Sequence, residues 1–68
     1  MERTAVRSSN VRSVGYADEI LEVEFHSGSV YQYRGVPEHV YTGLIAAASK
    51  GTYLDRMVKG AYGYSRVR

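Results

Sequence analysis

The sequence predicts an α+β domain in which a small antiparallel β-sheet, built as a hairpin or meander, is covered on one face by two short helices. Three observations lead to this prediction. Residues 19–25 and 30–34 alternate between apolar and polar side chains, as strands with one exposed face do. From residue 37 to residue 59 the apolar residues recur at helical spacing instead. A chain of 68 residues can build only one domain around one small core.

The N-terminal residues are the least regular part of the predicted sheet. Residues 1–7 are expected to form either a frayed arm or a short edge strand, and residues 8–68 are expected to form the single domain. Residues 11–16 can supply a strand ahead of the hairpin, with Gly15 and the Ala17-Asp18 pair giving the turn that follows. The sheet would then contain at least three consecutive antiparallel strands.

The segments 19–25 and 30–34 are expected to pair as a β-hairpin, because turn-forming residues separate them. Two loops are compatible with the sequence. A two-residue loop at Ser27-Gly28 would place both tyrosines of the second strand on the same face as the glutamates of the first. A three-residue loop over 26–28, with its glycine in the left-handed position of a bulge, would place the tyrosines on the opposite, aliphatic face.

The three-residue loop is favoured because it gathers the large apolar side chains on one face. It sets Val23 opposite Tyr31 and Leu21 opposite Tyr33. The two tyrosines of this Tyr-x-Tyr motif are then expected to bury their rings in the core, with their hydroxyls at its edge. They could stack on a ligand only if this register were wrong. The outer, exposed face would carry Glu22, Glu24, Gln32 and Arg34.

The first helix is expected to begin at Pro37, because the first turn of a helix tolerates the missing N–H of proline. Helical spacing continues to Ser49, and Gly51 is expected to end the helix as its C′ residue. The side chains expected to face the sheet are Val40, Tyr41, Leu44, Ile45 and Ala48.

A second short helix is expected over residues 53–59. Thr52 can cap it, with Asp55 completing an approximate capping box, and Gly60 can end it. Its inner face would consist of Leu54, Met57 and Val58. Residues 61–68 alternate again and are expected to form an edge strand, whose arginines would discourage pairing with other sheets.

The composition excludes several classes of function. The chain has no cysteine, which removes disulfides, thiolate metal sites and thiol nucleophiles. Its longest apolar run, 44–48, is far shorter than a membrane span, so a soluble, cytoplasmic protein is expected. His26 and His39 are far apart and lack an evident nucleophile or further metal ligands. We therefore expect no enzyme activity, metal, cofactor or small-molecule substrate.

Charge is distributed unevenly along the chain, whose net charge is +2. Residues 1–17 carry +2, residues 18–49 carry −4, and residues 50–68 carry +4. A basic end can attract the phosphates of a nucleic acid, and it can equally attract the acidic middle of the same molecule or of a second copy. A balanced surface is the simpler interpretation, because dedicated nucleic-acid binders usually have a more basic total.

The order of motifs resembles the KTSC family, a domain found at the C-terminus of some lysyl-tRNA synthetases and as small free-standing bacterial proteins. The resemblance extends from about Ser8 to Tyr64 and includes the Tyr-x-Tyr motif. Its elements are Ser9-Asn10, Tyr16, Leu21, Val23, Phe25, Gly28, Tyr31, Tyr33, Val36-Pro37, Ala48-Ser49, Gly51, Tyr53 and a final tyrosine. The family has no established function; its association with the synthetase suggests RNA binding, and it supplies no catalytic residues.

Two functions follow as hypotheses, both for a non-enzymatic binding module. Single-stranded RNA is held by positive charge and by rings that stack on bases. The candidates are Lys50, Arg56, Lys59, Arg66 and Arg68 for phosphate, with Tyr62 and Tyr64 for stacking. Alternatively, these tyrosines seal the sheet and the arginines keep its edge soluble. The second function is association with a protein partner or with a second copy, since tyrosine, arginine and free sheet edges also suit protein interfaces.

Overall fold

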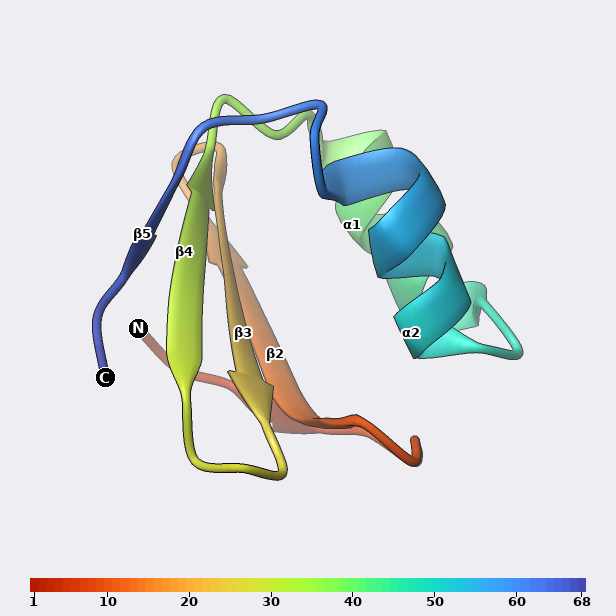
Figure 1. Ribbon diagram of the computed structural model, residues 1–68. Coiled ribbons are helices and arrows are strands. Elements are labelled where there is room, and N and C mark those ends of the chain that lie inside the picture. The colour runs from red at the N-terminus through yellow and green to blue at the C-terminus, as the bar shows by residue number, and fades with distance from the viewer.

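The computed structural model describes all residues from 1 to 68 and consists of a five-stranded antiparallel sheet with the helices packed on one face (Figure 1). The elements are β1 (Thr4–Ala5), β2 (Val11–Ala17), β3 (Ile20–Phe25), β4 (Val30–Arg34), α1 (Glu38–Ala46), α2 (Lys50–Tyr53), the π-helical turn η1 (Leu54–Val58) and β5 (Tyr64–Arg66). Each strand pairs with the next one along the chain. In the sequence the helices come between β4 and β5, which are themselves neighbours in the sheet. The predicted α+β fold is confirmed.

The hairpin of β3 and β4 has the register favoured by the sequence. Leu21 lies opposite Tyr33, and Val23 lies opposite Tyr31. Gly28 has a φ of 97°, in the left-handed region that only glycine enters freely, and its amide donates to the Phe25 carbonyl at 2.9 Å. The aliphatic side chains of β3 and the two tyrosine rings therefore share the inner face.

The turn between β2 and β3 differs from the prediction. Ala17 pairs with Ile20, so the two-residue loop consists of Asp18 and Glu19, which have φ values of 51° and 62°. Positive φ at both central residues is the geometry of a type I′ turn, whose twist matches that of the flanking strands. Gly15 was wrongly assigned to this turn. It lies inside β2, where a Cβ atom would be 2.5 Å from the carbonyl oxygen of Glu2.

The first helix is shorter than predicted. Pro37 is its N-cap and Ala47 its C-cap, where a ψ of 138° turns the chain out of the helix. Val40 and Leu44 are buried as expected. Ile45 and Ala48, which were expected to face the sheet, are exposed: Ile45 lies within α1 but is 38% exposed, and Ala48 lies beyond the end of the helix.

The second helix begins three residues earlier than predicted. Ser49 is its N-cap, and the side-chain oxygen of Ser49 accepts a hydrogen bond from the Thr52 amide at 3.3 Å. Thr52 is therefore not the cap, and Gly51 lies inside α2 instead of closing α1. A serine at the N-cap satisfies one of the amides that have no partner in the first turn.

The C-terminal part of this helix is wound as a π turn. The amide of Lys59 donates to the carbonyl of Leu54, five residues earlier, at 2.8 Å. This wider turn keeps Leu54 and Val58 together in the core and rotates Met57 away, so that 48% of Met57 is exposed. The prediction of an inward Met57 was wrong. Gly60, with a φ of 83°, ends the helix as predicted.

The hydrophobic core lies between the sheet and the helices. Its ten buried members are Val11, Val14, Leu21, Val23, Tyr33, Val36, Val40, Leu44, Leu54 and Val58. The hydroxyls of Tyr16 and Tyr53 donate to backbone carbonyls, at 2.6 Å to Val36 and 2.9 Å to Val40. The rings of these tyrosines are half-buried against the core, and their hydroxyls find hydrogen-bond partners inside the protein. None of the helices has the length and apolar character that crossing a bilayer would require.

The outer face of the sheet is less exposed than expected. β1 pairs with β2, and residues 1–3, which precede β1, lie across this face beside Gly15. As a result Glu22 is only 6% exposed. The carboxylate of Glu22 accepts hydrogen bonds from Arg3 at 2.6 Å and from Gln32 at 2.7 Å. Burial opposes its ionisation, but these hydrogen bonds and the Arg3 charge outweigh that effect and hold the pKa of Glu22 below its ordinary value.

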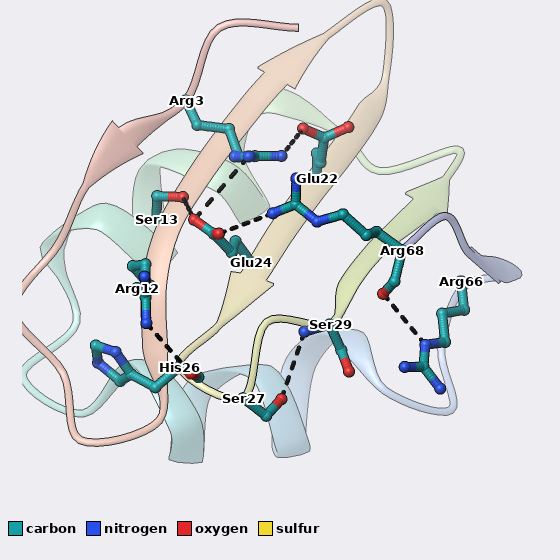
Figure 2. A network of polar contacts seen from close by, with 10 residues as sticks. All are labelled: Arg3, Arg12, Ser13, Glu22, Glu24, His26, Ser27, Ser29, Arg66 and Arg68. Carbon is teal, nitrogen blue, oxygen red and sulfur yellow. Dashed lines mark hydrogen bonds and ion pairs between the residues drawn. The ribbon is translucent and has the colours of Figure 1, made fainter.

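Glu24 joins both ends of the chain on the same face (Figure 2). Its carboxylate accepts from the Ser13 hydroxyl at 2.8 Å and from Arg68 at 2.9 Å, and Arg3 lies 4.0 Å away. The hydrogen bond from Ser13 is the main cause of a lowered Glu24 pKa, and the surrounding arginines add to it. Arg34 donates to the Ser65 hydroxyl at 2.8 Å and pairs with no glutamate, so the arginines that pair with glutamates on this face are Arg3 and Arg68.

Candidate functional site: an aromatic hollow

A hollow of about 440 Å³ opens on the helix-facing side of the sheet, at the point where the helical layer ends. We call it the aromatic hollow. The side chains that line it come from the β3–β4 hairpin, from β5 and from the residue that follows η1. They are Phe25, Ser27, Ser29, Tyr31, Tyr33, Lys59 and Tyr64. Its volume falls within the roughly 300–1,000 Å³ of small-molecule and cofactor pockets.

Strand geometry explains why four rings meet here. Tyr31 and Tyr33 are two residues apart on β4 and therefore share a face, with ring centroids 6.5 Å apart. Tyr64 is paired with Tyr33 across β4 and β5, and its ring lies 5.7 Å from Tyr33 and 5.6 Å from Tyr31. Phe25 meets Tyr31 edge to face, with centroids 5.8 Å apart. The result is a continuous aromatic wall.

The three tyrosines of this wall differ in exposure, and the one on the edge strand β5 is the most exposed. Tyr33 is 3% exposed, Tyr31 is half-buried and Tyr64 is 58% exposed. Their hydroxyls form no hydrogen bond with another protein group, unlike those of Tyr16 and Tyr53. Since every fully buried polar side-chain atom has a partner, the Tyr33 hydroxyl must reach solvent in the hollow.

A tyrosine hydroxyl is protonated at neutral pH, and the surroundings of Tyr33 favour that form further. Burial, followed by the neighbouring Tyr31, Tyr64 and Asp55, raises its pKa above the ordinary tyrosine value. At neutral pH the Tyr33 hydroxyl is therefore available as a hydrogen-bond donor and is unsuited to act as a base.

Positive charge lies at the rim of the hollow. The Lys59 ammonium is 5.5 Å from the centroid of the Phe25 ring, a cation–π distance, and 3.2 Å from the carboxylate of Asp55. Arg66 lies opposite Tyr31 in the β4–β5 ladder and so belongs to the same face. Its Nε donates to the carbonyl of Arg68 at 3.2 Å, as Figure 2 shows.

A second hollow of about 330 Å³ adjoins the first. We call it the polar hollow, because polar side chains dominate its lining. Its residues are Ser9, Asn10, Phe25, His26, Ser27, Gly51, Leu54, Asp55 and Lys59. Phe25, Ser27 and Lys59 line both hollows and form the boundary between them. No three acidic or histidine side chains lie together as a metal site would require.

The residues predicted from sequence are brought together only in part. Lys59 and Tyr64 line the aromatic hollow, with Arg66 on the same face. Tyr62 is half-buried against the core and does not line the hollow. Arg56 is exposed on η1 and lines neither hollow.

The two remaining basic candidates have partners elsewhere in the fold. The Lys50 ammonium donates to the carbonyls of Ile45 and Ala47 at 3.1 and 2.7 Å, where it neutralises the C-terminal end of α1. Arg68 is bound to Glu24 on the outer face. These contacts place both side chains outside the aromatic hollow.

Sequence reasoning did not assign five of the lining residues to a site: the rings of Phe25, Tyr31 and Tyr33, and the turn residues Ser27 and Ser29. The favoured register was right and Tyr33 is buried as expected, but Tyr31 is only half-buried, and both tyrosines line the hollow. Facing inward does not bury a side chain where no helix covers it, and the helical layer ends beside this part of β4. The available signal was that Phe25, Tyr31 and Tyr33 share one face of the predicted hairpin.

Comparisons with known proteins agree on one family. The model of the KTSC domain matches residues 7–62. A protein from Stutzerimonas stutzeri is 44% identical over 98% of this chain and 99% of its own length. A lysine–tRNA ligase from Trichormus variabilis is 43% identical over 72% of this chain, which corresponds to 9% of that enzyme. The crystal structure of a KTSC domain protein from Yersinia pestis is similar with a TM-score of 0.94 and 36% identity, over 98% of this chain and 97% of the other.

Proposed function

The chain belongs to the KTSC domain family, and on this premise we propose that it is a small non-enzymatic module that binds single-stranded RNA through the aromatic hollow. One observation carries the proposal: three tyrosine rings and a phenylalanine form an accessible wall with a lysine at its rim. Single-stranded nucleic acids are bound by this combination of stacking surface and positive charge.

The rings supply the base-binding element. Tyr64 is largely exposed and Tyr31 is half-buried, so each can offer part of its surface to a base. A stacked base contributes about 1–3 kcal/mol and is accepted whatever its sequence, because every base has a π face. The free hydroxyl of Tyr33 would add a hydrogen-bond donor at the inner end. This arrangement favours weak, sequence-tolerant binding.

Charge supplies the phosphate-binding element. Residues 50–68 carry a net charge of +4, and Lys59 and Arg66 lie on the side of the sheet where the rings gather. Three curated relatives are named lysine–tRNA ligase, so related domains occur in proteins whose name states an RNA substrate. Both facts support RNA as the first ligand to test.

Association with a protein is the second candidate. β5 is the last strand of the sheet, its three residues are all exposed, and Val67 beyond it is also exposed. A strand of a partner, or of a second copy, could add to this edge. Such an interface would respond weakly to salt, whereas phosphate binding weakens steeply as salt rises.

A two-dimensional amide NMR titration with mixed-sequence single-stranded RNA, at low and at moderate salt, tests the proposal. We expect salt-sensitive shifts centred on Tyr31, Lys59 and Tyr64. Replacing Lys59 and Arg66 together by alanine should flatten the slope of log affinity against log salt by about two units. The variant Arg7→Ala, which removes an exposed charge outside both hollows, is the control and should leave the slope unchanged. An absence of shifts at both salt concentrations would reject RNA and lead to the protein-association hypothesis.

A further inference from the structure

The polar hollow begins where the aromatic hollow ends. Phe25 and Lys59 line both, with the Lys59 ammonium held over the Phe25 ring. A ligand that stacks against Tyr31 and Tyr64 would therefore have its adjoining part directed toward the polar hollow. In a nucleic acid, the part that adjoins a base is its sugar.

The side chains of Ser9 and Asn10 are available to such a ligand. Neither the Ser9 hydroxyl nor the side-chain amide of Asn10 forms a hydrogen bond within the protein, whereas the backbone amide of Asn10 donates to the Ser8 hydroxyl at 3.3 Å. The segment itself is fixed, because the Asn10 carbonyl accepts from the His26 amide at 2.9 Å. Gly51 leaves space for the Asn10 side chain, whose Nδ2 would lie only 3.0 Å from a Cβ atom at position 51. The Asn10 side-chain amide therefore lies beside Gly51 at the wall of the hollow, with its donors and acceptor unused.

Asp55 adds a hydrogen-bond acceptor that carries negative charge, as a phosphate does. Lys59 binds its Oδ1 at 3.2 Å, and 66% of the Asp55 side chain is exposed, so its second oxygen is free. A carboxylate repels phosphate but accepts a hydrogen bond from a hydroxyl. The lining thus suits a neutral, hydroxyl-bearing group better than an anion.

We propose that the polar hollow binds the ribose of the nucleotide whose base stacks in the aromatic hollow, with Asn10 and Asp55 recognising its 2′-hydroxyl. The consequence is a preference for RNA over DNA of the same sequence, because only the 2′-hydroxyl distinguishes the two sugars at a given site. This inference rests on the proposed function and adds the chemical class of nucleic acid to it.

Fluorescence anisotropy with three labelled oligonucleotides of one length tests the inference: oligouridine, oligodeoxyuridine and 2′-O-methyl oligouridine. All three carry the same base and the same phosphates, so differences in affinity report the sugar alone. We expect the RNA to bind about five- to tenfold more tightly than the DNA, which corresponds to one or two hydrogen bonds. The 2′-O-methyl strand, which has lost the donor, should bind like the DNA.

Two variants locate the effect, and two others provide controls. Asp55→Asn and Asn10→Ala should each bring the ratio of RNA to DNA affinity to within about twofold of one. Asp55 is exposed, so Asp55→Asn is expected to fold normally even if Asn10→Ala does not. Glu38→Gln makes the same change of charge at an exposed site outside both hollows and should leave the ratio unchanged. Tyr64→Ala should weaken RNA and DNA alike.

The outcomes separate this inference from the proposed function. Equal affinity for all three strands, with binding still lost in Tyr64→Ala, would overturn the ribose site and leave the aromatic hollow in place. A normal RNA preference in Asp55→Asn and Asn10→Ala would also overturn the assignment of these residues. Failure of every strand to bind would overturn the proposed function itself, and the ribose site with it.

Discussion

At the scale of single residues, a glycine in α1 allows α1 and α2 to approach each other closely. Gly43 of α1 lies against the hydroxyl end of Tyr53 in α2, and that hydroxyl donates to the Val40 carbonyl at 2.9 Å. A Cβ atom at position 43 would overlap the Tyr53 hydroxyl. The contact is therefore made by a backbone surface on one side and a ring on the other.

Gly43→Ala should lower the free energy of unfolding by about 1–3 kcal/mol, because overpacking forces the two helices apart. Chemical denaturation followed by circular dichroism measures this change. In the background of Tyr53→Phe, which removes the obstructing oxygen, the penalty should be smaller. An equal penalty in both backgrounds would show that the Tyr53 hydroxyl is not the cause.

The role of a single residue could be predicted from the sequence only where neighbouring residues in the chain impose its conformation. The left-handed conformation of Gly28 could be predicted, since it follows from the loop length and parity of one hairpin. The roles of Gly15 and Gly43 could not, because each faces a segment that is distant in the sequence or on another helix. No local pattern signals such close approaches.

At the scale of elements, the start of α2 is the clearest difference between prediction and structure. Both Ser49 and Thr52 are plausible caps, and apolar residues recur at helical spacing across the whole of 37–59. Periodicity alone therefore does not reveal where one helix ends and the next begins. The chain leaves α1 at Ala47, and this makes Ser49 the residue with extended backbone before the next helix.

Ser49→Ala should destabilise the protein by about 1 kcal/mol, because it leaves the Thr52 amide without its capping acceptor. Thr52→Ala should cost less, since the Thr52 hydroxyl only accepts from the Ser49 hydroxyl at 2.9 Å. Urea denaturation of the two variants side by side measures the difference. A larger loss for Thr52→Ala would mean that Thr52 is the cap after all.

At the scale of the whole molecule, the two ends of the chain meet on the outer face of the sheet. Arg3 precedes β1 and Arg68 follows β5, and both bind acidic residues of the central strand β3. Figure 2 shows the two arginines converging on Glu22 and Glu24. Opposite charges at the basic ends and in the acidic middle are thus paired within one molecule, at least on this face.

These pairs predict how stability depends on pH. The pKa values of Glu22 and Glu24 are lowered in the folded protein, so the folded state binds fewer protons than the unfolded chain. Their contribution is complete above the unfolded pKa of about 4.3 and is lost as pH falls through the lower folded values. Stability measured by urea denaturation should therefore decline from about pH 5 downward.

Substitutions identify the groups responsible for this pH dependence. Glu22→Gln and Arg3→Met should each flatten the decline below about pH 5. Glu38→Gln, whose carboxylate takes part in no ion pair or hydrogen bond in the fold, is the control. If both test variants kept the full decline, the outer-face network would not be its source.

The sequence by itself determined the fold class, the pairing of β3 with β4 and the face that carries Tyr31 and Tyr33. It could do so because side-chain parity in a strand and glycine in a turn are local properties, readable over a few residues. The same information indicated that Lys59, Tyr64 and Arg66 belong to one basic and aromatic segment, without showing what they face.

Only the tertiary structure decided which of these faces are covered. The inner face is open at Tyr31 because the helical layer ends at Lys59, and the outer face is closed over Glu22 because the N-terminal residues cross Gly15. Coverage depends on where distant segments come to lie, which alternation within one strand cannot specify. For this reason the two tyrosines of the hairpin belong both to the core and to the candidate binding site.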